Sequence, residues 1–275
     1  MVGKADLHTH TTHSDGSLTP DELVKKAKAV GIQILSITDH DTVNGIDEAI
    51  KTGKDLGVEV IPGVELSANV DSTEIHILGY FIDHCDKGLL EYLKMFRDQR
   101  LKRAERIVDR LNKINIPITL DSVLEQAGIG SVGRPHIATT LVNGGHVQSY
   151  QQAFSKYLSD GRPAFEKKLD CPPEEILNLI ASAGGLSFLA HPGRAFNDKL
   201  LIQLIDAGLD GIEVIHPSHS VHLTTYYRGI VSEYYLLESG GSDYHGGLRG
   251  DEYIFGKISV SGENVDTMRR RLYVT

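Results

Sequence analysis

The start of the chain carries several side chains that could bind a metal ion. The segment Ala5-Asp6-Leu7-His8-Thr9-His10 places two histidines two positions apart, and Asp15 comes after a polar stretch. In an extended segment, side chains two positions apart point to the same side, so both imidazoles can reach one cation. Asp15 lies past a turn and can fold back toward a second cation. Single His-x-His pairs are common on protein surfaces, so this pair taken alone is weak evidence for a metal site.

Length and composition fit a globular enzyme. The chain has 275 residues, of which 40% are hydrophobic and 24% charged, enough for one large core or a core with an inserted subdomain. No apolar run is long enough to cross a membrane, and the N-terminus does not resemble a secretory leader. The two cysteines form no CxxC pair, which favours a reducing cytoplasm. The net charge of −9 implies that any phosphate is bound by local positive groups.

Strand-like runs alternate with helix-like stretches along the chain. Thr19 is placed to cap a helix that ends before Gly31, and an apolar strand is expected over residues 32–37. A second helix is expected from about residue 44 to residue 56, followed by a strand over residues 58–61. The order of strand, polar loop and helix predicts a parallel α/β fold.

Candidate ligands recur at or just after the ends of the predicted strands: His8, His40, Glu65, His191, Asp243 and His245. In a closed β/α barrel these ends converge on one face, where such barrels carry their chemistry. A single histidine after a strand is more often a turn or core residue. The recurrence of the pattern makes one shared site the better explanation.

The donor types narrow the choice of metal. The full candidate set is His8, His10, Asp15, His40, Glu65, His76, His191, Asp243 and His245. Imidazoles and carboxylates without thiolates suit zinc, manganese or ferrous iron. A structural zinc site would close with four ligands, usually including cysteine. At three or four ligands per ion the set predicts two or three divalent metals, an arrangement typical of phosphoester hydrolysis.

Five short motifs together resemble the polymerase and histidinol phosphatase (PHP) family: His8-Thr9-His10, Thr38-Asp39-His40-Asp41, Gly63-Val64-Glu65, His191-Pro192 and Ser242-Asp243-Tyr244-His245. The resemblance implies a distorted (β/α)7 barrel with a trinuclear metal centre. It assigns one ion to His8, His10, Glu65 and Asp243, a second to Glu65, His76 and His191, and a third to Asp15, His40 and His245. Many family members have histidine where this chain has Asp15, so the third site here is richer in oxygen ligands. Oxygen ligands favour manganese, with iron or zinc as alternatives.

Within this family the chain is most similar to stand-alone phosphoesterases that act on nucleoside 3′,5′-bisphosphates and on 5′ ends of short RNA. Arg134 and His136 lie at an expected helix start, a position that favours anions, and Arg194 comes three residues after His191. His216 lies just after another strand and could bind phosphate or carry a proton. The alternatives are surface ion pairs for the two arginines and a packed loop histidine for His216.

The mechanism that the resemblance implies is hydrolysis by a hydroxide that bridges two metals. Arg134 and Arg194 would stabilise the charge on the phosphate oxygens, and His216 would supply a proton to the leaving oxygen. The expected substrate is therefore a phosphorylated nucleotide or a short oligonucleotide. No membrane and no obligate protein partner is expected.

The middle of the chain interrupts the barrel pattern. Apolar residues recur there at helical spacing, so we expect an inserted helical cap over residues 89–165 and a barrel formed by residues 1–88 and 166–275. The basic run at 97–103 is broken by acids, which favours a solvated helix face over a nucleic-acid surface.

Two other functions share these motifs. A histidinol-phosphate phosphatase would carry the same metal set. A non-catalytic PHP accessory module is an alternative of another class, although such modules sit in far larger chains and degenerate ones lose ligands. This chain retains every ligand position, which favours a free-standing enzyme.

Overall fold

The chain divides into two compact units. The structure, a computed structural model, describes residues 3–70, 73–167, 171–194, 196–247 and 250–273. Residues 1–91 and 170–275 form the first unit, and residues 92–169 form the second. The first unit contains the sheet, and the second is helical. The role of the helical segment as a cap remains a prediction.

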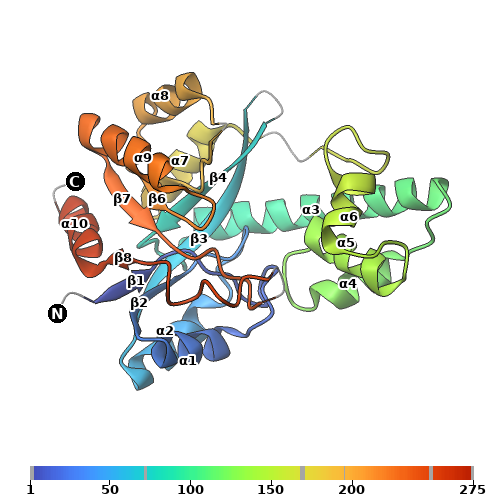
Figure 1. Cartoon of the computed structure of the whole chain (residues 1–275), viewed down its shortest axis with the longest axis horizontal. Helices are drawn as coiled ribbons and strands as arrows, with labels where there is room; N and C mark the ends of the chain where they lie inside the picture. The colour runs from blue at the N-terminus through green and yellow to red at the C-terminus, as the bar shows by residue number, and fades with distance from the viewer. Residues whose placement is uncertain (1–2, 71–72, 168–170, 195, 248–249, 274–275) are drawn as a thin grey trace. The chain divides into compact units, whose positions relative to one another are not determined.

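The first unit is built around one sheet (Figure 1). Its strands are β1 (Lys4–Asp6), β2 (Ile32–Ile37), β3 (Glu59–Val70), β4 (Thr73–Tyr80), β5 (Leu186–Leu189), β6 (Gly211–Ile215), β7 (Leu237–Gly240) and β8 (Val260–Ser261). Their order is β7-β6-β5-β4-β3-β2-β1-β8. A parallel bridge joins Thr9 to Tyr244, and the Asp243 N–H donates to the His8 carbonyl over 2.9 Å. These contacts tie the exits of β1 and β7 together, so the sheet nearly closes into the expected α/β barrel.

One central strand runs against the direction expected for a parallel barrel. β4 pairs antiparallel with both β3 and β5, and the short β8 pairs antiparallel with β1. Strand β3 is also longer than the expected 58–61, because it continues through residue 70 as a hairpin partner of β4. The start of an antiparallel strand lies at the same edge as the ends of its neighbours. His76, in the first half of β4, therefore belongs to the face that carries the other ligand candidates.

Helices pack around the sheet of the first unit (Figure 1): α1 (Pro20–Ala29), α2 (Ile46–Leu56), α7 (Pro173–Ser182), α8 (Asp198–Asp206), α9 (Val221–Glu233) and α10 (Gly262–Leu272). α1 contacts β2, α2 contacts β3, α9 contacts β6 and β7, and α10 contacts β1 and β7. The capping box predicted at Thr19 is present, because its hydroxyl accepts from the Glu22 N–H and the Glu22 carboxylate accepts from the Thr19 N–H. α2 ends at Gly57, which has a left-handed φ of 67°.

The second unit has its own apolar core. Its elements are the long α3 (Lys87–Lys113), which begins in the first unit, α4 (Leu120–Ala127), α5 (Arg134–Asn143), α6 (Tyr150–Ala153) and a π-helix, η1 (Phe154–Leu158). Leu111, Val123, Ile137 and Leu158 are buried together in its core. Across the described residues, the structure contains no helix with the length and apolar character needed to span a bilayer.

Candidate metal centre

The strand ends bring all nine candidate ligands into one cluster. Four overlapping groups of donor atoms each fit within 4.8 Å: His10-Asp15-His40-His245, His8-His10-Asp243, His8-Glu65-His191 and His40-Glu65-His76. His76 joins the set because β4 is antiparallel. The groups share members, so the geometry itself does not divide the ligands into the three sets that the resemblance implies.

Glu65 lies at the middle of this cluster. It is fully buried, and its Oε1 lies 2.8 Å from His76 Nδ1 and 3.0 Å from His191 Nε2. Its Oε2 lies 3.0 Å from His40 Nδ1, 3.3 Å from His10 Nε2 and 3.4 Å from His8 Nε2. Each carboxylate oxygen therefore faces a different group of imidazoles, an arrangement suited to a ligand shared between ions.

Two further carboxylates extend the cluster on either side. Asp243 Oδ1 lies 3.1 Å from His10 Nε2 and 3.3 Å from His8 Nε2. Asp15 Oδ1 lies 3.3 Å from His245 Nε2, and its Oδ2 lies 4.0 Å from His40 Nε2. Asp15 thus faces the opposite side of His10 from Asp243, as expected for a carboxylate that serves a separate ion.

Several buried nitrogen and oxygen atoms in this cluster have close polar neighbours but form no hydrogen bond of good geometry. Within the described residues these include His8 Nε2, His10 Nε2, His40 Nδ1 and Glu65 Oε2. Buried polar atoms of a native protein are almost always paired, and each exception needs an explanation. Bound cations would satisfy these atoms at once, because neutral imidazole nitrogens and carboxylate oxygens are metal ligands. The donor set therefore fits divalent ions.

Burial and charge act against each other in the cluster. Burial alone would raise the pKa of Glu65, but the neighbouring histidines His40 and His76 outweigh it and hold the pKa well below its ordinary value. Burial likewise opposes ionisation of His76, yet Glu65 raises its pKa to about 9. For His10, burial dominates and the adjacent His245 adds to it, so its pKa falls to about 3. Glu65 is thus ionised and places negative charge where cations are expected.

The strand ends that carry these ligands have unusual backbone geometry. His191 has a φ of 27° and Asp243 a φ of 50°, both in the left-handed region that residues other than glycine rarely adopt. Asp41, which comes after His40, has a φ of 51°. Such conformations persist only where surrounding contacts impose them, and they concentrate at functional sites.

A second layer of side chains supports the ligands. Asp39 accepts from the Thr11 N–H, the Thr11 hydroxyl and the Ser14 hydroxyl at 2.5–2.7 Å. Glu213, which lies outside the sequence motifs, accepts from His8 Nδ1 and from the His191 N–H. The signal for it in the sequence is a glutamate within the apolar strand run Gly211-Ile212-Glu213-Val214-Ile215.

His216 and Arg194 lie in the same unit as the cluster. His216 Nε2 is 3.5 Å from Asp243 Oδ2, and its ring centroid is 5.3 Å from that of His191. Arg194 is exposed, and among the described residues it forms no hydrogen bond or ion pair. The alternative of a surface ion pair for Arg194 therefore has no partner in the described part of the chain.

Arg134 and His136 lie in the second unit, on the first turn of α5. The Arg134 guanidinium lies over the Phe154 ring at 5.9 Å, and Nη1 donates to the Leu158 carbonyl of the π-helix over 3.5 Å. His136 Nδ1 accepts from the Gly133 N–H over 3.1 Å, which closes the helix start. Their predicted contact with phosphate stays a prediction.

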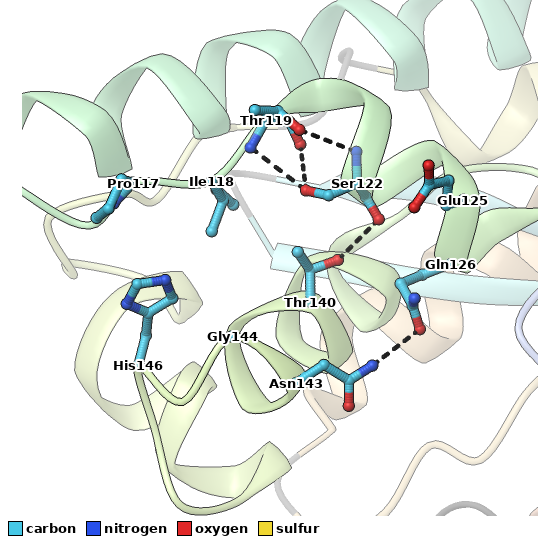
Figure 2. Close-up of a pocket in the computed structure, with 10 residues that line it drawn as sticks. All are labelled: Pro117, Ile118, Thr119, Ser122, Glu125, Gln126, Thr140, Asn143, Gly144 and His146. Atoms are coloured by element: carbon cyan, nitrogen blue, oxygen red, sulfur yellow. Dashed lines mark hydrogen bonds between the residues drawn. The ribbon is translucent and has the colours of Figure 1, made fainter.

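The second unit also contains a pocket of about 340 Å³ that none of the predicted site residues lines (Figure 2). Several of its polar side chains form hydrogen bonds with one another or with the nearby backbone. Asn143 donates to Gln126 over 3.2 Å, and the Thr140 hydroxyl donates to the Ser122 carbonyl over 3.4 Å. Thr119 and Ser122 form the capping box of α4 in its wall.

Comparison with known proteins gives a consistent assignment. The PHP domain model matches residues 6–97. A 5′-3′ exoribonuclease of Haemophilus influenzae is 38% identical over 89% of this chain and 91% of its own length. A 3′,5′-nucleoside bisphosphate phosphatase of Chromobacterium violaceum is 33% identical over 89% and 88%. A crystal structure from Bifidobacterium adolescentis, provisionally assigned as a metal-dependent phosphoesterase, superimposes with a TM-score of 0.90 at 31% identity and covers 97% of this chain and 96% of its own. This chain belongs to the PHP family.

Proposed function

We propose that the chain is a metal-dependent phosphoesterase that acts on phosphorylated nucleotides. The proposed reactions are removal of the 3′-phosphate of nucleoside 3′,5′-bisphosphates and cleavage at the 5′ ends of short RNA. Two relatives are named a 5′-3′ exoribonuclease and a 3′,5′-nucleoside bisphosphate phosphatase, which supports these classes of substrate. The observation that carries the chemistry is the set of four overlapping groups of candidate ligand atoms, in which several buried ring nitrogens lack a hydrogen bond of good geometry.

The proposal assigns two or three divalent ions to the cluster. The ligands would be His8, His10, Glu65 and Asp243 for one ion, Glu65, His76 and His191 for the next, and Asp15, His40 and His245 for the third. Oxygen from Asp15 favours manganese, with iron or zinc as alternatives. When bound, these ions would place positive charge beside the phosphate oxygens and lower the pKa of a nearby water.

His216 is the side chain best arranged to supply a proton. Its Nδ1 lies 2.7 Å from the Ser218 hydroxyl oxygen and 3.1 Å from the Ser218 backbone nitrogen, and these contacts hold the ring with Nε2 3.5 Å from Asp243 Oδ2. Among the described residues, that buried Nε2 has no hydrogen bond of good geometry. We assign His216, in its imidazolium form, the transfer of the Nε2 proton to the leaving oxygen of the substrate, which returns the ring to its neutral form.

Two arginines would bind the phosphate groups. Arg194 lies three residues beyond the ligand His191, and its exposed guanidinium is available to a substrate. Arg134 has a ring and a carbonyl beside it that restrict its guanidinium, which lowers the entropy lost when it binds an anion. A guanidinium binds phosphate through two parallel hydrogen bonds, so each arginine would both orient and hold the substrate.

Product release from a defined substrate panel tests this proposal, with inorganic phosphate measured for the phosphomonoesters and mononucleotides measured for the RNA. The panel contains a nucleoside 3′,5′-bisphosphate, a short 5′-phosphorylated RNA and histidinol phosphate, each measured with manganese and with a chelator. We expect turnover of one or both nucleotide substrates with manganese and none after chelation. Preference for histidinol phosphate would replace the substrate assignment, and full activity after chelation would overturn the metal mechanism.

A further inference from the structure

Glu213 is a buried carboxylate that touches two of the proposed ligands without facing the centre of the cluster. It lies on β6 and is fully buried. Its Oε1 accepts from His8 Nδ1 over 2.9 Å, and its Oε2 accepts from the backbone N–H of His191 over 2.7 Å. The two ligand-bearing segments are 183 residues apart in the chain (191 − 8) and meet at this one side chain.

The contact with His8 decides which ring nitrogen faces the cluster. A carboxylate at Nδ1 requires a proton there, so the neutral ring has its lone pair on Nε2. His8 Nε2 lies 3.3 Å from Asp243 Oδ1 and 3.4 Å from Glu65 Oε2, among the other donor atoms. A hydrogen-bond partner on the second nitrogen fixes the ring orientation and raises the basicity of a metal-binding histidine.

The contact with His191 holds a strained segment. The φ of 27° at His191 is unfavourable for a residue with a side chain and must be imposed by its surroundings. Glu213 fixes the N–H at that residue. Two residues later, the Gly193 N–H donates to His219 Nε2 over 3.1 Å, and the Gly193 carbonyl accepts from the Tyr227 hydroxyl over 2.6 Å. The loop is therefore fixed at His191 and again at Gly193, which holds His191 Nε2 beside Glu65.

We propose that Glu213 is a positioning residue of the metal centre, which sets the ring of His8 and the backbone of His191 for ion binding. This inference rests on the proposed function, because it assumes that both histidines bind metal. Both partners of Glu213 are N–H donors, so the site requires two acceptors. A glutamine has only one oxygen that can accept a hydrogen bond. Its NH₂ group would face the second N–H donor, and that donor would lose its acceptor.

The test is manganese titration of the chelated protein by calorimetry, together with phosphate release at low and high manganese. For Glu213→Gln we expect affinity for the ion to fall about 10- to 100-fold, as for other second-layer changes. Activity at limiting manganese should fall with it and recover in part when manganese is in excess. A purely structural role would lower the unfolding temperature without this dependence on metal concentration.

Asp210→Asn is the matched control. Asp210 precedes β6 and accepts from the N–H and hydroxyl of Ser187 at 2.9 and 3.1 Å, away from the ligands. This variant should keep wild-type manganese affinity. If Glu213→Gln does not fold, Glu213→Asp decides, since its shorter side chain cannot reach both partners. Wild-type affinity in the folded variant overturns the inference, whereas failure of the wild-type protein to bind manganese overturns the proposed function.

Discussion

Two polar regions of this chain use their hydrogen-bonding capacity in opposite ways. At the strand ends of the first unit, buried nitrogens of His8, His10 and His40 crowd around carboxylates and form no hydrogen bond of good geometry within the described residues. In the pocket of the second unit, polar groups such as Asn143 and Gln126 pair with each other. A buried polar atom without a hydrogen-bond partner costs folding free energy unless a bound ion or molecule contacts it. A polar group that is already hydrogen-bonded needs no such partner. The difference supports the proposal that the first region binds the metal ions, whereas the described residues of the second contain no comparable set of buried atoms that await a partner.

The largest expected effect comes from removing a carboxylate from the strand-end cluster. Asp243→Asn should lower kcat/KM by about 10³-fold, which corresponds to ~4 kcal/mol, because an amide oxygen is a neutral and weaker metal ligand. Metal analysis of the purified variant and phosphate release at saturating manganese measure the loss. Near-wild-type turnover would remove the distinction between the two regions.

Arg134 should give the next largest effect, although it lies in the helical unit. Loss of a charge-assisted contact to phosphate is worth about 1.5–3 kcal/mol, so Arg134→Ala should raise KM about 10- to 100-fold and change kcat less. Arg134→Lys keeps the charge but loses the two parallel donors of the guanidinium, so its KM should lie between those of the wild-type protein and Arg134→Ala. A kcat effect as large as that of Asp243→Asn would argue against a binding role.

Asp6 gives a smaller effect that depends on pH. Burial is the main cause that raises its pKa to about 7, while its Oδ1 accepts from the Ser242 N–H over 2.9 Å. The folded protein therefore keeps a proton that the unfolded chain releases above its ordinary pKa of 3.8. The stability that protonated Asp6 contributes is fully present below pH 3.8, and it is lost as the pH rises from there toward about 7.

Asp6→Asn should remove this dependence, because the amide is neutral at every pH and can still accept through its oxygen. In chelator, the variant's advantage in unfolding free energy should grow by on the order of 2 kcal/mol between about pH 5 and pH 8. Urea unfolding at both pH values measures it. Parallel stability changes in the two proteins would show that Asp6 is already ionised in the fold.

The clustering of the candidate ligands could be predicted from sequence because most of them lie just after a strand, and strand ends converge by topology. His76 lies outside the five motifs, and only the family resemblance assigned it to an ion; its place in the cluster follows from the antiparallel direction of β4. Glu213 was missed because its role depends on contacts with His8 and His191, which sequence spacing does not encode. The same limit applies to the strained backbone at His191, which arises from packing rather than from local preference.

The smallest effects are expected in the pocket of the second unit, and they test the comparison from its other side. Asn143→Ala removes the donor to Gln126 and exposes no buried charge, so the free energy of unfolding should fall by about 0.5–1 kcal/mol. Affinity for manganese and KM for the nucleotide substrate should not change. Thermal unfolding and phosphate release on the same preparation measure both. A rise in KM comparable to that of Arg134→Ala would mean that paired side chains also contact substrate, and that unpaired donors alone do not mark the binding site in this fold.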